Sequence, residues 1–220
     1  MDQPLAGLTV VEFATGIAGP YAGKLLADYG ADVIKVEPPG GDPARRESPR
    51  PGPRPDPERS PLFLHLNRNK RSVVVDVESA DDRTFLDTLL AGADIVIEST
   101  PPGEAPPGLA AEELRAAHPG LVVTSVTPFG HTGPYAGWPA SELTIYAMAG
   151  PLPATGAPDR EPIRLAGNII QYQCGAVAAA STLAAVAMAE ASGRGTHVDV
   201  SNFETQAGSI DRRIALLVRH

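Results

Sequence analysis

The stretch that decides the fold is LTVVEFATGIAGPYAGKLLADYGADVIKVE, residues 8–37. It opens with a short apolar run over residues 8–13, which is typical of a buried strand. Gly19 and Pro20 then begin a helical pattern over residues 21–29, and Gly30 is placed to end it. A second strand is predicted over residues 32–37. A strand, a helix and a strand in this order favour parallel pairing with a right-handed crossover.

The same alternation continues to the end of the chain. Further strands are predicted over residues 72–76, 95–98, 121–126 and 196–200, and further helices over residues 80–91, 110–117, 143–148, 171–189 and 202–217. Six strands that alternate with helices predict a three-layer α/β fold with a mostly parallel sheet, as a single domain over residues 1–220. Sites in such folds lie beyond the carboxyl ends of the strands.

Residues 38–61 interrupt this pattern, with nine prolines and five arginines in 24 residues. Proline removes backbone donors, so this segment is predicted to be an exposed excursion outside any helix or central strand. Its arginines are interpreted as solubilising an acidic protein, with an anion site as the alternative.

Composition excludes several classes of function. Eighteen basic against 26 acidic residues give a net charge of −8, the opposite of what binding to nucleic acid needs. The single cysteine, Cys174, excludes an internal disulfide and a cysteine-based zinc site, and it suits a reducing compartment. The five histidines have no metal-ligand spacing, so no metal is expected.

Residues 165–189 carry no charge, yet they are rich in alanine and interrupted by glycine, asparagine and glutamine. This composition favours a buried helix of small residues over a membrane span. The opening residues also lack the basic region of a secretory signal. We therefore expect a soluble, cytoplasmic protein with no membrane partner.

Four local features stay ambiguous from the residues alone. The turn over residues 14–20 leads a strand into a helix and is either a tight structural turn or an anion loop. The basic residues Lys70 and Arg71 belong to a solvated turn or contact phosphate. Cys174 is interpreted as a buried hydrophobe rather than a nucleophile. Glu142 opens a helix, where it either complements the helix dipole or serves a site.

Taken together, several motifs resemble those of the family III CoA-transferases, which include formyl-CoA, carnitine and bile-acid CoA-transferases and 2-methylacyl-CoA racemases. The matching stretches are PLAGLTVVEF (4–13), AGP (18–20), LADYGADVIKVE (26–37), NKRS (69–72), FGHTGPY (129–135) and GRGTHVDVS (193–201). The resemblance implies a Rossmann-like large domain, without the family's small domain. It also implies interlocked dimers, so the chain is a fragment, one half of a tandem fusion, or a subunit of a homodimer or heteromer whose partner supplies the rest.

The resemblance also implies covalent chemistry. In the family an aspartate attacks the acyl-CoA thioester to give a mixed anhydride and then carries CoA as an aspartyl thioester, because a carboxylate can be both nucleophile and leaving group. That aspartate follows a Pro-x-Arg segment and opens a helix of small residues. Here Pro162-Ile-Arg164 leads to Gln171 at the aligned position. A neutral amide cannot form the anhydride.

Other positions depart from the family as well. Ile17 stands where transferases often have glutamine, Pro38 where a basic residue often follows the strand, Ser99-Thr100 where Asn-Phe is common, and Ser141-Glu142 where racemases have His-Asp. The resemblance implies coenzyme A or an acyl-CoA as the ligand. It assigns catalytic positions to Gln171 and Glu142, and CoA contacts to Gly16, Ile17, Ala18, Lys70, Arg71, Ser99 and Gly130.

Three functions fit these residues. The leading hypothesis is a CoA-transferase-like chain that is catalytically degenerate alone and acts as a partner half or subunit. The second is an active acyl-CoA transferase or racemase that uses another carboxylate, with Glu142 as the best candidate. The third is a non-enzymatic domain that binds a small anion in the same cleft.

Overall fold

A single parallel sheet forms the centre of the molecule in the computed structural model, which describes residues 3–47, 56–157 and 159–209. Its strands lie in the order β3-β2-β1-β4-β5-β6, and each pairs in parallel with its neighbours. The strands are β1 (Thr9–Glu12), β2 (Asp32–Glu37), β3 (Arg71–Val74), β4 (Ile95–Glu98), β5 (Val122–Thr127) and β6 (His197–Ser201). The predicted three-layer α/β fold with a parallel sheet is confirmed.

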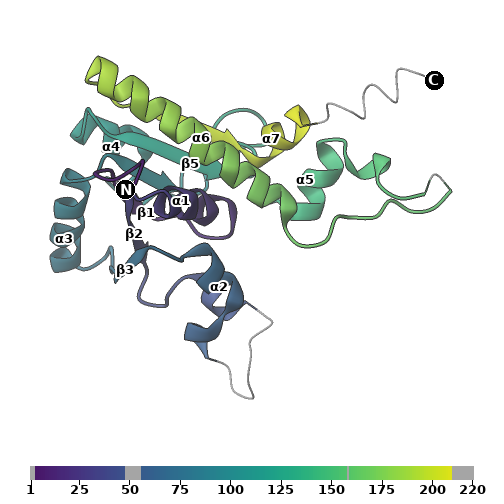
Figure 1. The fold of residues 1–220 in the computed structure, drawn as a ribbon, viewed down its shortest axis with the longest axis horizontal. Coiled ribbons are helices and arrows are strands. Elements are labelled where there is room, and N and C mark those ends of the chain that lie inside the picture. Colours follow the sequence, from purple (N-terminus) through teal and green to yellow (C-terminus); the bar gives the residue numbers. More distant parts are fainter. Residues whose placement is uncertain (1–2, 48–55, 158, 210–220) are drawn as a thin grey trace.

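Helices cover both faces of the sheet (Figure 1). They are α1 (Ala18–Asp28), α2 (Pro61–Leu66), α3 (Ala80–Ala91), α4 (Ala111–Ala117), α5 (Glu142–Met148), α6 (Ile169–Ser192) and α7 (Asn202–Gly208), with 3₁₀ turns at Pro43–Arg46, Pro57–Arg59 and Leu152–Ala154. Helices α1 and α6 pack on the face that carries Val10, whereas α3 and α4 pack on the face that carries Val11. Alternate strand residues point to opposite faces, so each β1 valine belongs to a different core.

Close contact between α1 and α6 explains why both helices are rich in small residues. A Cβ on Gly175 would lie 2.5 Å from the backbone oxygen of Ala18 and 3.1 Å from the Tyr21 side chain. Cys174 is fully buried in the same core, and burial raises the pKa of its thiol to about 11. The prediction that Cys174 is a buried hydrophobe is therefore confirmed.

Helix α6 is the one described helix that is long and apolar enough to cross a membrane, with a mean hydropathy of 1.5 over its most apolar window. Of that window, 39% is buried inside the protein, as expected when one face of a helix packs on a core. The helix begins two residues before the predicted start at Gln171. The last helix, predicted to reach residue 217, is described only to Gly208, and residues 210–220 lie outside the described part.

In the described parts of this segment, 38–47 and 56–61, most residues are exposed and none lies in a strand, as predicted, but a few residues anchor the segment to the rest of the fold. Asp42, Ala44 and Ser60 are buried, and the Ser60 hydroxyl donates to the Ala44 carbonyl oxygen at 2.6 Å. Helix α2 also begins inside this segment, at Pro61, with Ser60 as its N-cap. Prolines are compatible with this because they occupy the first positions of the 3₁₀ turns and of α2, where no N–H donor is needed.

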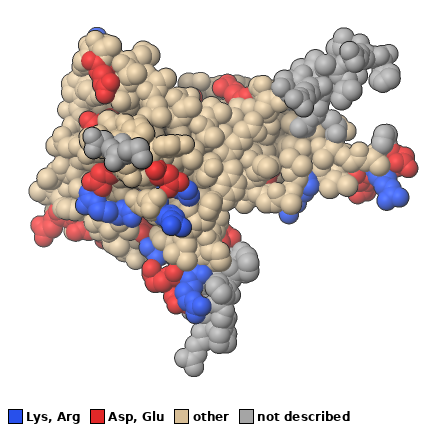
Figure 2. Space-filling view, viewed as in Figure 1, with Lys and Arg blue, Asp and Glu red and all other residues tan. Residues whose placement is uncertain are grey.

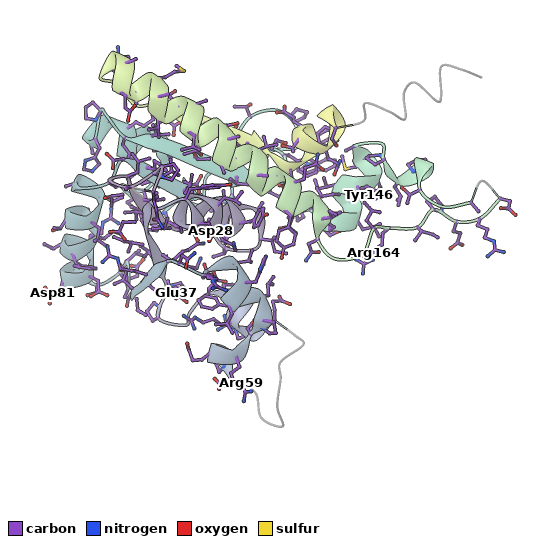
Figure 3. The ribbon with its side chains drawn as sticks, viewed as in Figure 1. Asp28, Glu37, Arg59, Asp81, Tyr146 and Arg164 are labelled. Carbon is purple, nitrogen blue, oxygen red and sulfur yellow. The ribbon has the colours of Figure 1, made fainter. Side chains whose placement is uncertain are left out.

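Arg45 does not act as a solubilising surface residue. Its guanidinium donates two hydrogen bonds to Glu37, at 2.6 and 2.8 Å, and stacks 3.7 Å from the centre of the Phe63 ring. Burial alone would raise the pKa of Glu37, but the hydrogen bonds from Arg45 and Ser72 lower it to about 2. Glu37 is labelled in Figure 3, at the carboxyl end of β2. A bidentate ion pair thus joins this segment to the sheet.

Candidate functional site

A cavity of about 210 Å³ lies at the carboxyl ends of β1, β4 and β5. The strand order reverses between β1 and β4, which is where open α/β sheets place their ligands. The cavity is lined by residues from the turn before α1, the ends of β4 and β5, and the first turns of α5, α6 and α7: Thr15, Ala18, Gly19, Ser99, Val126, Pro128, Ala140, Ser141, Glu142, Ile145, Ile170, Gln171 and Asn202.

The turn before α1 forms one wall of the cavity. The backbone N–H of Thr15 donates to Ser99 Oγ at 2.9 Å, which joins the ends of β1 and β4. Gly16 has a φ of +76°, and a Cβ on Gly19 would collide with the Ala14 side chain. The turn is therefore tight, as the first alternative has it, and it also lines the cavity, while its role as an anion loop stays a prediction. Ile17 is only 5% exposed and packs inward.

Glu142 and Gln171 come together from different helices. Glu142 stands at the start of α5, and its Oε1 accepts a hydrogen bond of 2.8 Å from the backbone N–H of Ile170 in α6. Gln171 lies one residue further along α6, and its Oε1 is 3.9 Å from where a Cβ on Gly16 would stand. The two positions that the resemblance singled out as catalytic thus line the same cavity.

The lining of this cavity is unusual for an anion-binding site, because it contains an acid and no basic side chain among the described residues. Burial raises the pKa of the Glu142 carboxyl, and the amides of Ile170 and Gln171 and the charge of Arg164 only partly oppose this. Arg164 is exposed on the segment that leads to α6, as Figure 3 shows. Among the described residues that line the cavity, none is lysine, arginine or histidine. A carboxylate ligand would therefore find no cation in the lining.

Chemically, this arrangement offers hydrogen bonding and one acid. Gln171 can donate and accept hydrogen bonds, but its amide cannot be acylated as a carboxylate can. Glu142 has the raised pKa of a general acid or base, although its Oε1 is already engaged by Ile170. The lining contains no other ionisable side chain among the described residues.

Lys70 and Arg71 do not contribute to this cavity. The Lys70 ammonium is buried and donates to Glu12, to the Pro20 carbonyl oxygen and to Asn67. Arg71 begins β3, at the amino end of the sheet, and its guanidinium pairs with Asp32. The Lys70 donors are engaged internally and Arg71 stands away from the cavity, so neither residue lines it, and their contact with CoA stays a prediction.

Gly130 is also absent from the lining. It has a φ of +80°, and a Cβ there would stand 3.3 Å from Asp199 Oδ2. Beside it, the His131 N–H donates to Asp199 at 2.8 Å, and the His131 and His197 rings lie 5.6 Å apart. The described residues contain no cluster of three His, Cys, Asp or Glu side chains that could hold a metal.

Among the polar side chains of the lining, sequence reasoning missed Asn202. Asn202 directly follows β6, so its position at a carboxyl strand end was the available signal. Only the fold shows that β6 ends beside β5 and brings Asn202 to the cavity.

The chain is similar to known proteins over most of its length. The profile of CoA-transferase family III matches residues 5–216. The chain is 40% identical over 212 residues to the succinyl-CoA:(R)-benzylsuccinate CoA-transferase subunit BbsE of Thauera aromatica, covering 96% of this chain and 52% of that protein. It is 38% identical over 208 residues to the succinate–glutarate CoA-transferase of Agrobacterium fabrum, covering 93% and 52%.

A solved structure agrees. A CAIB/BAIF family protein from Brucella suis superposes with a TM-score of 0.92 at 38% identity, over 100% of this chain and 58% of that one. The chain thus spans about half the length of the curated relatives it matches. Sequence, fold and the placement of the cavity agree, and the chain belongs to CoA-transferase family III.

Proposed function

We propose that this chain is a large domain of a family III CoA-transferase that binds an acyl-CoA but does not form the covalent acyl intermediate by itself. One observation carries the proposal: the cavity side chain at the nucleophile position is Gln171. The cleft itself is formed, since residues of the α1 turn, Ser99 and Glu142 all line the same cavity. Loss of the nucleophile with retention of the cleft supports a binding or partner role.

A partner chain or domain that carries the aspartate would complete the enzyme. The relative from Thauera aromatica is itself named as a subunit, and the chain matches about half of each of the two relatives. Helix α6 presents exposed apolar side chains, among them Ile169 at 50%, Val177 at 41% and Met188 at 63% exposure. Figure 2 shows the surface along this helix nearly free of charged residues on the face drawn. Such a surface supports burial against a partner.

The second candidate is an enzyme that uses Glu142 as its carboxylate. It is favoured by the position of Glu142 in the cavity and by the raised pKa of its carboxyl group. A reducing, cytoplasmic setting is proposed for either candidate, and the single cysteine supports it.

Trapping with hydroxylamine or borohydride separates the two candidates. We expect no labelled peptide when the purified 220-residue chain is incubated with an acyl-CoA. A labelled peptide containing Glu142 would contradict the degenerate role and support the second candidate. The variant Gln171→Asp should bind the same thioester and form a trappable adduct, and Gln173→Asp, on an exposed position two residues away, is the matched control.

A further inference from the structure

Two polar atoms at the cavity have no hydrogen-bond partner among the described residues. Glu142 Oε2 and Asn202 Oδ1 are both buried and accept no well-formed hydrogen bond, although the Gln171 side chain lies close enough to the Glu142 carboxyl to favour its charged form. They belong to residues that line the same cavity, one from α5 and one from α7. Native proteins rarely leave such atoms unsatisfied, and each costs folding free energy. Two of them at one cavity indicate a ligand group that completes them.

The chemistry of that ligand group follows from the lining. A carboxylate oxygen is only an acceptor while it is ionised, and the oxygen of an asparagine amide is always one. Both therefore need an N–H or O–H donor from the ligand. A carboxylate on the ligand would bring its own acceptor oxygens against the acceptor oxygens of Glu142 and Asn202. No basic side chain among the described lining residues would offset its charge.

Building on the function proposed above, we propose that this cavity takes, beside Glu142 and Asn202, an uncharged group that carries N–H or O–H donors, such as a carboxamide or a hydroxyl, in preference to a carboxylate. Glu142 and Asn202 are the residues that determine this specificity. The group belongs either to the acyl chain of a CoA thioester or to the pantetheine arm, whose amides and hydroxyl offer the same donors.

A pair of isosteric ligands tests the preference. Succinamoyl-CoA and succinyl-CoA differ only in a terminal amide against a terminal carboxylate, and their affinities are measured by calorimetry with the full chain at neutral pH. We expect the amide to bind at least about tenfold more tightly, the factor expected when a buried acceptor gains a donor. Unacylated CoA gives the baseline.

The variant Glu142→Gln then exchanges the unpaired acceptor for a donor. Its remaining oxygen still accepts from the Ile170 N–H, so the contact between α5 and α6 is kept. We expect the preference for the amide to fall by at least about tenfold. Glu161→Gln, an exposed carboxyl outside the lining, is the matched control and should leave the preference unchanged. Thermal unfolding of each variant checks that it folds.

The outcomes separate the two sources and the two proposals. Equal weakening of CoA and both thioesters in Glu142→Gln and Asn202→Ala would assign the donors to the pantetheine arm. A wild-type preference for the carboxylate, or variants that change neither affinity nor preference, would overturn this inference and leave the proposed function standing. Failure of CoA and both thioesters to bind at millimolar concentration would overturn both.

Discussion

Two sets of buried polar side chains in this molecule differ in how they are paired. Beside β1 and β2, Glu12, Lys35, Asp42 and Lys70 have side chains that are at most 2% exposed, and each carboxylate faces an ammonium. Lys35 lies 3.1 Å from Glu12 and 2.8 Å from Asp42, and Lys70 lies 2.8 Å from Glu12. At the cavity, in contrast, Glu142 leaves one oxygen without a partner.

This difference indicates what each set does. The paired set joins β1, β2, the segment after β2 and the turn before β3, so its charges stabilise the fold from within. Its members have their charges paired within the protein, and the Lys70 ammonium is bonded to Glu12, Pro20 and Asn67. The unpaired set stands where a ligand can enter, and its missing partner is the signature of binding. Buried charge alone therefore does not identify a site, whereas acceptors left open at a cavity support one.

The largest expected effect is on the paired set. Replacing Glu12 by glutamine leaves the buried Lys70 ammonium without a carboxylate, and removing one partner of a buried pair costs about 3–5 kcal/mol. Urea unfolding at neutral pH should show this loss. Glu58→Gln is the control, because the Glu58 side chain is 77% exposed and its pair with Arg45 is a surface contact. A loss for Glu12→Gln no greater than that of the control would mean that the set does not stabilise the fold.

A smaller effect of opposite sign is expected at the cavity. Burial raises the pKa of Glu142, so its carboxyl stabilises the fold below the unfolded pKa of 4.5, and that contribution is lost as the pH rises through the folded value. Glu142→Gln should therefore match or exceed the wild type at neutral pH, by up to about 1 kcal/mol, with a lead that shrinks on acidification. Chemical unfolding at several pH values measures it. Destabilisation at neutral pH would show that Glu142 is a structural group like Glu12.

The smallest effect is expected at the surface pair of Arg71 and Asp32, whose side chains are 65% and 50% exposed. Arg71→Ala should cost no more than about 1 kcal/mol, because solvent and salt screen exposed pairs. Its affinity for CoA, measured by calorimetry at low and high salt, should equal that of the wild type. If the affinity of Arg71→Ala for CoA fell tenfold or more at low salt, Arg71 would be supported as a contact to the CoA phosphates.

Much of the fold could be predicted from local patterns. The strands over residues 32–37 and 95–98 and the helix over residues 80–91 have the predicted bounds, because apolar runs and a closing glycine mark them directly. The segment after β2 is exposed at most of its described residues, as predicted, but its proline and arginine content could not show what anchors it. What orders it is a pairing of Arg45 with Glu37, eight residues earlier, and a stack on Phe63.

For the candidate site too, some residues could be predicted from the sequence and others could not. Gln171 and Glu142 were found through family motifs, and the structure brings both to one cavity. The resemblance could not show that Lys70 is enclosed by Glu12, nor that Asn202 completes the cavity, since both depend on contacts between segments far apart in the chain.

By itself the sequence determined the order of strands and helices, the small residues where α1 and α6 meet, and the amide at the nucleophile position. These are local properties, because periodicity, glycine placement and residue chemistry act over a few neighbours. Tertiary structure alone decided which charged groups are paired and which acceptors are left open at the cavity. The physical reason is that a buried polar group is satisfied or unsatisfied according to what the fold places within hydrogen-bond distance, here from segments 28 and 58 residues apart.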